Sequence, residues 1–126
     1  MNKIVHFSDL DAWKVNHEVA RQVYKLTEGF PRKEQFGMID QLRRAAVSVT
    51  ANIAEGWGRY SYPDRIRFYL QARGSIYEIQ NFLILAKDLG YVETSLFTET
   101  FQKVEEGCKV LNGLIRSLEA RLANSK

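Results

Sequence analysis

Apolar residues recur every three or four positions along almost the whole chain, which is the spacing of an amphipathic helix. The most regular stretch follows Thr94, where apolar positions are alternately four and three residues apart. Its members are Phe97, Phe101, Val104, Cys108, Leu111, Ile115, Leu118 and Leu122. A heptad seam of this kind needs other helices to pack against. The pattern therefore predicts a long C-terminal helix packed against helices of the same molecule.

The first part of the chain predicts a helix over residues 9–28. Ser8 and Asp11 have the spacing of a capping box at its start. The sequence Gly29-Phe30-Pro31 ends the pattern, because proline cannot continue a helix.

Two further helices are predicted between Pro31 and Gly90. One is expected to start near Glu34 and to run to Gly58. The other is expected to begin at Pro63, with Ser61 or Tyr62 as its N-cap, and to stop at Gly90. Four helices with short connections predict an all-α, antiparallel up-and-down four-helix bundle.

Length and composition place this bundle in one domain over residues 1–126. The chain has 45% hydrophobic and 26% charged residues, which are ordinary values for a globular protein. Its longest apolar run, 82–86, is far shorter than the roughly 20 residues needed to span a bilayer. The first ten residues lack the apolar core of a secretory signal. We expect a soluble, cytoplasmic protein that has no membrane partner.

The two central helices carry more apolar residues than a bundle core needs. No charge occurs from Ala45 to Ala54, and Leu70, Ile84 and Leu85 lie off the main apolar stripe of the third helix. Two polar lanes mix small or amide side chains with charges of both signs, and the lane of the second helix is predicted to lie opposite its apolar stripe. The polar lanes are Arg44, Ser48, Asn52 and Glu55 in the second helix, and Arg67, Gln71, Gly74 and Glu78 in the third. We expect them to form contacts between helices or between copies of the chain, although an ordinary wet helix face remains the alternative.

Three segments carry a family resemblance: FSDLDAWKVNHEVARQVYKLTEGFP, QLRRAAVSVTANIAEGWGR and FYLQARGSIYEIQNFLILAKDLGY. They resemble the 23S rRNA intervening-sequence proteins, small bacterial four-helix bundles. The resemblance spans residues 7–91, and the last helix matches in pattern only. Thr50 departs from it, because relatives usually have a proline there that bends the second helix, so a kink at this position stays open.

The resemblance implies a ring-shaped homo-oligomer, commonly of five copies, without an established catalytic activity or agreed functional residues. A related branch of proteins assists the reverse transcriptase of diversity-generating retroelements and binds nucleic acid. It thus implies three kinds of partner: further copies of the chain, RNA or DNA, and a reverse transcriptase. The protein-interaction scaffold that works without binding nucleic acid is the alternative function.

The sequence shows no catalytic or metal-binding constellation, and we expect neither an enzyme nor a cofactor. His6 and His17 have no second ligand at helical spacing, and Cys108 occupies a core position of the last heptad seam. Glu55 and Glu78 are the strongest acid–base pair, but neighbouring arginines would keep both ionised.

Basic residues favour nucleic acid as the ligand. The chain has a net charge of +3, and five copies would carry +15. The predicted phosphate-binding residues are Arg43, Arg59, Arg65 and Arg73, with Trp57, Tyr60 or Tyr62 close enough in sequence to stack on bases. We expect the lane arginines, Arg44 and Arg67, to form ion pairs with the carboxylates of Glu55, Asp64 and Glu78. Arg59 and Arg65 would then have no ion pair and could bind phosphate.

Overall fold

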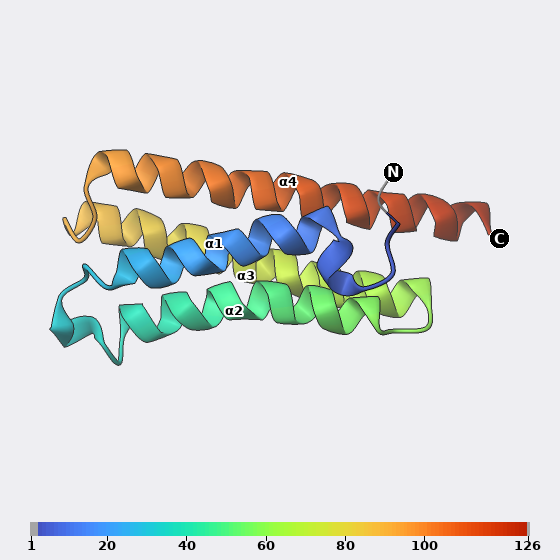
Figure 1. Ribbon diagram of the computed structural model, residues 1–126, viewed down its shortest axis with the longest axis horizontal. Coiled ribbons are helices and arrows are strands. Elements are labelled where there is room, and N and C mark those ends of the chain that lie inside the picture. The colour runs from blue at the N-terminus through green and yellow to red at the C-terminus, as the bar shows by residue number, and fades with distance from the viewer. Residues whose placement is uncertain (1–2, 126) are drawn as a thin grey trace.

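The computed structural model, which describes residues 3–125, confirms the all-helical, up-and-down bundle (Figure 1). The helices are α1 (Asp11–Thr27), α2 (Met38–Trp57), α3 (Tyr62–Asp88) and α4 (Thr94–Asn124). Two short 3-10 turns, η1 (Phe7–Asp9) and η2 (Arg32–Glu34), precede α1 and α2. No strand occurs in these residues, and none of their helices is both long and apolar enough to cross a membrane.

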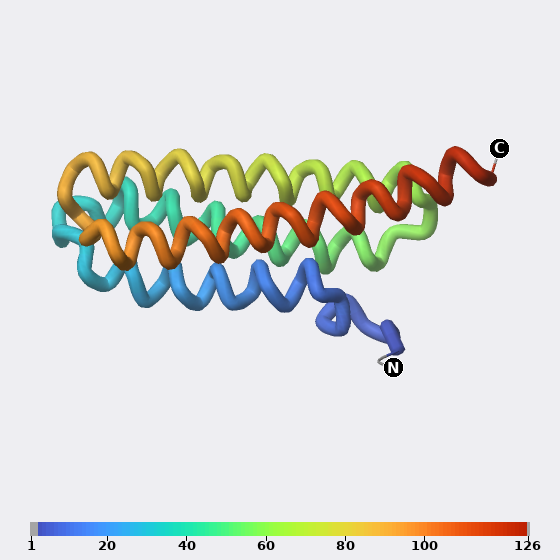
Figure 2. Tube along the Cα trace, turned by 90° about the horizontal axis from the view of Figure 1, so that it is seen from above, coloured from blue at the N-terminus to red at the C-terminus, as the bar shows by residue number. Residues whose placement is uncertain are grey.

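The four helices stand at the corners of a square. Each packs against the helix that follows it, and α1 also packs against α4, whereas no Cα atoms of diagonally placed helices come within 8 Å of each other in the described residues. The tube in Figure 2 shows the long helices side by side, with the N-terminus, the α2–α3 turn and the end of α4 at the same end of the molecule. Grooves between neighbouring helices are therefore the main concave features of the surface.

The core is made of the apolar stripes that the sequence predicts. Leu42, Ile53, Ile76, Leu83 and Leu111 are completely buried. Every position of the α4 heptad seam is buried or half-buried, so the prediction of a packed C-terminal helix is confirmed.

Two helix starts differ from the prediction. Residues 7–9 form η1, in which His6 and Asp9 make the capping box, and α1 begins only at Asp11. The Asp9 carboxylate is occupied here, since it accepts hydrogen bonds from the backbone N–H groups of Val5 and His6, both at 3.0 Å. The predicted capping box of Ser8 and Asp11 is therefore wrong: the capping box here belongs to the 3-10 turn, and α1 has Leu10 as its N-cap, without a side-chain hydrogen bond.

The second helix starts at Met38 and not near Glu34. Residues 32–34 form η2, and Glu34 reaches across to accept a hydrogen bond from the Met38 N–H at 3.3 Å. From Met38 the helix continues without a break through Thr50 to Trp57.

The limits of α3 agree with the prediction. Ser61 is its N-cap and accepts a hydrogen bond from the Asp64 N–H at 3.3 Å. At the other end, Gly90 has φ of +75°, and the N–H of Tyr91 donates to the carbonyl of Ala86. This left-handed glycine satisfies the last carbonyls of the helix and turns the chain toward α4.

Small residues let α2 and α3 approach closely. A Cβ atom at Gly56 would lie 2.7 Å from the Tyr69 ring, so only glycine leaves room for that ring. Further along the same pair, the hydroxyl groups of Ser48 and Ser75 lie 2.9 Å apart and share a hydrogen bond.

Candidate functional site

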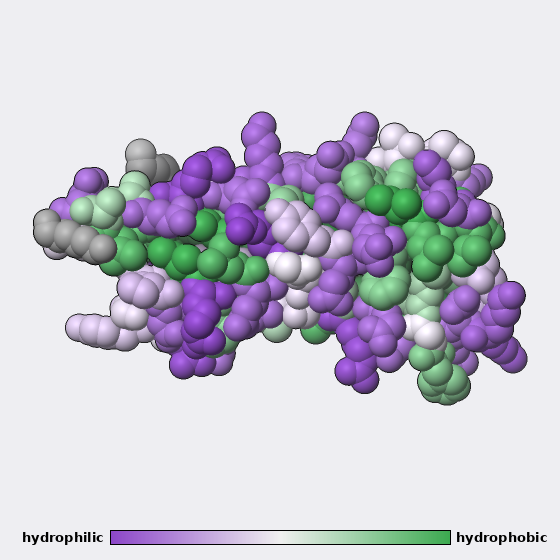
Figure 3. Space-filling model, turned by 180° about the vertical axis from the view of Figure 1, so that it is seen from behind, coloured by the Kyte–Doolittle hydropathy of each residue, from purple (hydrophilic) through white to green (hydrophobic). Residues whose placement is uncertain are grey.

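The outer side of α3 exposes more large apolar side chains than any other described helix. Their exposed fractions range from 40% to 53%, although a helix of this length has a large core face available. We call this surface the α3 face; it comprises Leu70, Tyr77, Ile84, Leu85 and Leu89. Figure 3 views the molecule from behind, and green apolar areas there are separated by purple polar groups. The expected apolar excess of the third helix is thus left uncovered by the rest of the subunit.

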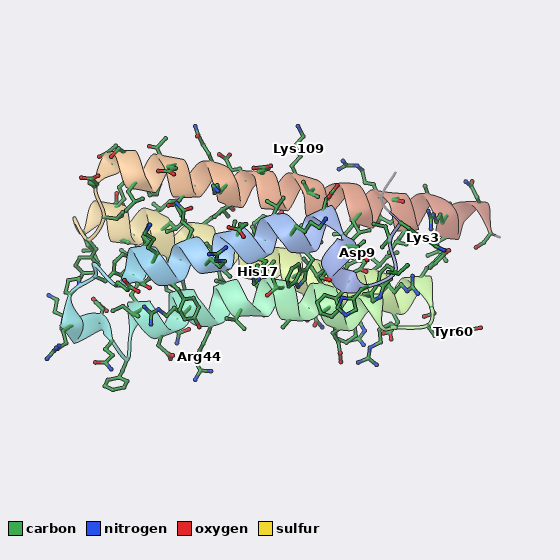
Figure 4. All side chains as sticks on the ribbon, in the orientation of Figure 1. Lys3, Asp9, His17, Arg44, Tyr60 and Lys109 are labelled. Atoms are coloured by element: carbon green, nitrogen blue, oxygen red, sulfur yellow. The ribbon has the colours of Figure 1, made fainter. Side chains whose placement is uncertain are left out.

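The α2 polar lane lies beside α3 and not on the side opposite the core. Ser48 and Asn52 are half-buried, and the Asn52 amide donates to the Ser48 carbonyl at 2.9 Å. Arg44 points outward from α2 (Figure 4). Its guanidinium pairs with Asp40 at 3.0 Å, whereas we expected a pair with Glu55. The Ser48 hydroxyl of this lane therefore contacts α3 through Ser75, the Asn52 amide bonds within α2, and the charged Arg44 and Glu55 are exposed.

The α3 polar lane makes few hydrogen bonds or ion pairs with the described residues. Arg67 pairs with Asp64 at 2.8 Å, as expected, and its guanidinium carbon lies 4.4 Å from the centre of the Phe68 ring. Gln71 and Glu78 are exposed and make no side-chain hydrogen bond or ion pair with the described residues. A Cβ atom at Gly74 would meet nothing within 4 Å. No hydrogen bond or ion pair of the described residues joins the α2 lane to the α3 lane. The polar groups of Gln71 and Glu78 are therefore available for contacts with another molecule.

Two of the four predicted phosphate-binding arginines are used inside the bundle. Arg43 donates to Thr27 Oγ1 at 2.8 Å and to the Tyr24 carbonyl at 3.2 Å, which ties α2 to α1. Arg73 donates to Asn112 Oδ1 at 3.1 Å and ties α3 to α4. The two residues lie in grooves on opposite sides of the square, so the structure does not bring them into one patch.

Arg59 and Arg65 do come together, at the α2–α3 turn. Arg59 pairs with Glu55 at 2.7 Å and more loosely with Asp64 at 3.8 Å, which overturns the expectation that these carboxylates leave it free. Arg65 has no ion pair with the described residues, and its Nε donates to the Arg59 carbonyl at 2.7 Å. Between them, Tyr60 is 100% exposed and projects from the turn (Figure 4). This end therefore presents a fully exposed aromatic ring on the same turn as the two arginines.

His17 and Cys108, the groups considered for metal binding or nucleophilic chemistry, have packing or hydrogen-bond partners within the bundle. His17 stacks on Trp13 with ring centres 4.5 Å apart. Burial raises the pKa of the Cys108 thiol, although Arg73 and the Asn112 amide partly oppose this. Among residues 3–125, no three His, Cys, Asp or Glu side chains cluster in a way that could hold a metal ion.

The sequence reasoning missed Tyr69 and Arg121, which lie near Arg65 around a cavity at this same end. Tyr69 occupies an ordinary core position of α3, and Arg121 stands in a charged segment of α4. No motif or spacing links these positions, because only the bundle places the end of α4 beside the start of α3.

Comparisons with known proteins agree on the fold. A family model described as 23S rRNA-intervening sequence protein matches residues 8–113. Among solved structures, the chain is similar to a crystal structure of a protein with unknown function from the S23 ribosomal protein family of Bacteroides thetaiotaomicron VPI-5482. The two share 23% sequence identity and a TM-score of 0.77, over 83% of this chain and 95% of that one. No curated protein matches this chain.

Proposed function

Because this chain belongs to the 23S rRNA-intervening sequence protein family, we propose that it acts as a ring-shaped homo-oligomer that binds nucleic acid and catalyses no reaction. The observation that carries this proposal is the α3 face, whose five large apolar residues are uncovered in the single subunit. Exposed apolar surface of this kind is typical of protein interfaces.

A second copy of the chain is the proposed occupant of the α3 face. Arg67 and Glu78 lie at two points along the same helix, so the face offers charges of both signs to the surface of a neighbouring copy. Gly74 lies between them with open space above it, and a neighbouring backbone can approach closely there.

A closed ring needs a second, different surface on each subunit. The groove between α1 and α2, of about 760 Å³, supports this role. Tyr24 and Val47 line it and are 43% and 47% exposed. The α3 face of one copy would then dock on the α1–α2 groove of the next, and the family resemblance favours five copies.

The end of the bundle at the α2–α3 turn is the proposed nucleic-acid surface. Arg65 supplies a charge that no carboxylate neutralises within the described subunit, and the exposed Tyr60 ring can stack on an unpaired base. One such end binds phosphate weakly. A ring repeats it in every copy, and repeated weak contacts strengthen binding through avidity.

The assembly is tested by light scattering on a sizing column over a dilution series. We expect the wild type to elute as an oligomer and Ile84→Glu to elute as a monomer, because the charge would be buried in the interface. Phe36→Glu is the matched control, since Phe36 is 88% exposed but lies outside the α3 face. A monomeric wild type at all concentrations would overturn the ring.

Nucleic-acid binding is tested by fluorescence anisotropy with labelled single-stranded RNA and DNA at rising salt. We expect log affinity to fall linearly with log salt concentration, and Arg59→Ala with Arg65→Ala to make the slope shallower. Tyr60→Ala should weaken binding about tenfold without changing the slope, because stacking is not ionic. Arg32→Ala, at the opposite end, is the charge control. No binding at low salt would exclude this function and favour a protein-interaction scaffold.

A further inference from the structure

A cavity of about 290 Å³ lies at the end of the bundle that holds the N-terminal segment, the α2–α3 turn and the end of α4. Its apolar wall includes Trp57 from α2, Leu10 before α1, and Leu114 and Leu118 from α4. The polar groups on its lining come from Arg65, Tyr69, Ser117 and Arg121, and no carboxylate is among its lining residues. The cavity is thus both apolar and positively charged.

Tyr69 contributes a buried hydroxyl group that has no partner among the described residues. The residue is only 1% exposed, and its hydroxyl makes no hydrogen bond with the described residues. The described residues contain no fully buried side-chain oxygen or nitrogen without a partner, which agrees with a Tyr69 hydroxyl that reaches open space. Since Tyr69 lines the cavity, the cavity is that space. A buried tyrosine hydroxyl is ordinarily hydrogen-bonded, so this one is available to a ligand.

Packing holds the Tyr69 ring in this position. Gly56 leaves the space that the ring fills, since a Cβ atom there would lie 2.7 Å from Cε1 of Tyr69. Burial raises the pKa of the Tyr69 hydroxyl and the nearby Arg65 charge partly opposes this, so the group is a neutral donor at physiological pH. The hydroxyl is therefore fixed and protonated before any ligand arrives.

Arg65 is also held in place before a ligand arrives. Its Nε donates to the Arg59 carbonyl, and its guanidinium carbon lies 5.9 Å from the ring centres of both Trp57 and Tyr62. The terminal nitrogen atoms of Arg65 make no hydrogen bond with the described residues. Arg121 lines the cavity from α4; it is exposed, and its guanidinium group makes no hydrogen bond or ion pair with the described residues. Two unneutralised guanidinium groups beside a free hydroxyl form a donor set suited to an oxyanion.

We propose that this cavity binds a small organic anion with an apolar body, such as an aryl-substituted carboxylate. Arg65, Arg121 and the Tyr69 hydroxyl hold the acidic head, while Trp57, Leu114 and Leu118 cover the apolar part. The volume is at the lower end for ligand pockets, which suits one ring and a short chain. This site is formed within a single subunit, so it requires neither the ring nor nucleic acid.

The test compares phenylbutyrate with phenylbutanol, which has the same apolar body without the charge. Binding is followed by calorimetry and by the fluorescence of Trp57, with Trp13 outside the cavity as a constant background. We expect phenylbutyrate to bind at least about tenfold more tightly than phenylbutanol, and Arg121→Gln to weaken its binding about tenfold. Arg116→Gln, which removes the same charge from α4 outside the cavity, should leave binding unchanged.

Tyr69→Phe separates a ligand-binding hydroxyl from a structural one. It should weaken phenylbutyrate binding several-fold while leaving the melting temperature unchanged or higher, because the hydroxyl has no protein partner to lose. Equal binding of the two probes, or no binding of phenylbutyrate, would overturn the proposal. So would a Tyr69→Phe variant that melts several degrees earlier. Tyr60→Ala should reduce nucleic-acid binding and leave phenylbutyrate binding intact, so the two proposals fail separately.

Discussion

Asn16 on α1 occupies the space that a side chain at position 107 of α4 would need. Its amide donates to the Gly107 carbonyl at 3.2 Å and to the Ala12 carbonyl at 2.8 Å, and the residue is 2% exposed. A Cβ atom at Gly107 would come within 3.0 Å of the Asn16 Cγ atom. The buried amide and the glycine therefore fix together how closely α1 and α4 approach.

Gly107→Ala should destabilise the protein, although alanine is the better helix former. Overpacking against the Asn16 amide lowers the free energy of unfolding by about 1–3 kcal/mol, and the better helix propensity of alanine raises it by up to about 1 kcal/mol. We therefore expect a net loss of about 1–2 kcal/mol. Urea denaturation measures this. Gly113→Ala in the same helix is the control, since a Cβ atom there meets nothing within 4 Å. It should stabilise the protein by about 0.5–1 kcal/mol, and equal effects of the two changes would contradict the packing argument.

Gly74→Leu should affect the subunit and its assembly in opposite directions. Position 74 is open in the single subunit, so leucine should stabilise the helix by up to about 1 kcal/mol. If a second copy packs closely on the α3 face, the same side chain must weaken association. Light scattering over a dilution series, together with urea denaturation at low concentration, separates the two effects. Association unchanged from the wild type would show that Gly74 lies outside the interface.

Tyr91→Phe should make stability less sensitive to acid. The Tyr91 hydroxyl donates to Glu34 Oε2 at 2.8 Å and, with the Met38 N–H, lowers the pKa of Glu34 below 4.5. Because the folded state favours the ionised carboxylate, this stabilisation is present above pH 4.5 and is lost as the pH falls through the lowered pKa.

Urea midpoints measured from neutral pH down to about pH 3 should therefore converge for the wild type and Tyr91→Phe as Glu34 becomes protonated. Near neutral pH the wild type should be the more stable of the two. Curves that stay parallel throughout the acid range would show that the Tyr91 hydroxyl does not favour the ionised form of Glu34.

Cys108 should react slowly with thiol reagents in the folded protein. Burial raises the pKa of its half-buried thiol, so little reactive thiolate is present at mildly alkaline pH. We expect labelling by iodoacetamide to be at least about tenfold slower than in the same chain unfolded in urea. Equal rates would show an accessible, ordinary thiol.

Local signals in the chain predicted much of the fold. The heptad seam of α4, the N-cap at Ser61 and the stop at Gly90 all depend on residues within a few positions of one another. The starts of α1 and α2 could not be predicted in the same way, because a short 3-10 turn precedes each helix and takes up the first residues of the predicted span. His6 with Asp9 formed one such turn, and Glu34 reached Met38 across another.

The candidate site was only partly predictable for a related reason. Arg43 and Arg73 are predicted phosphate ligands, and the structure adds that each lies in a groove between two helices, where Thr27 or Asn112 accepts a hydrogen bond from it. The exposure of Leu70 and Ile84, in contrast, followed from their place off the apolar stripe, because helix geometry alone sets that angle.

The amino-acid sequence by itself determined four amphipathic helices and their antiparallel order, because periodicity and short connections act between near neighbours in the chain. Only the tertiary structure decided which arginines keep free donors and that the Tyr69 hydroxyl opens into a cavity beside Arg121. Both outcomes depend on contacts between residues of different helices at one end of the bundle. The spacing of these residues along the chain does not indicate that they lie close together.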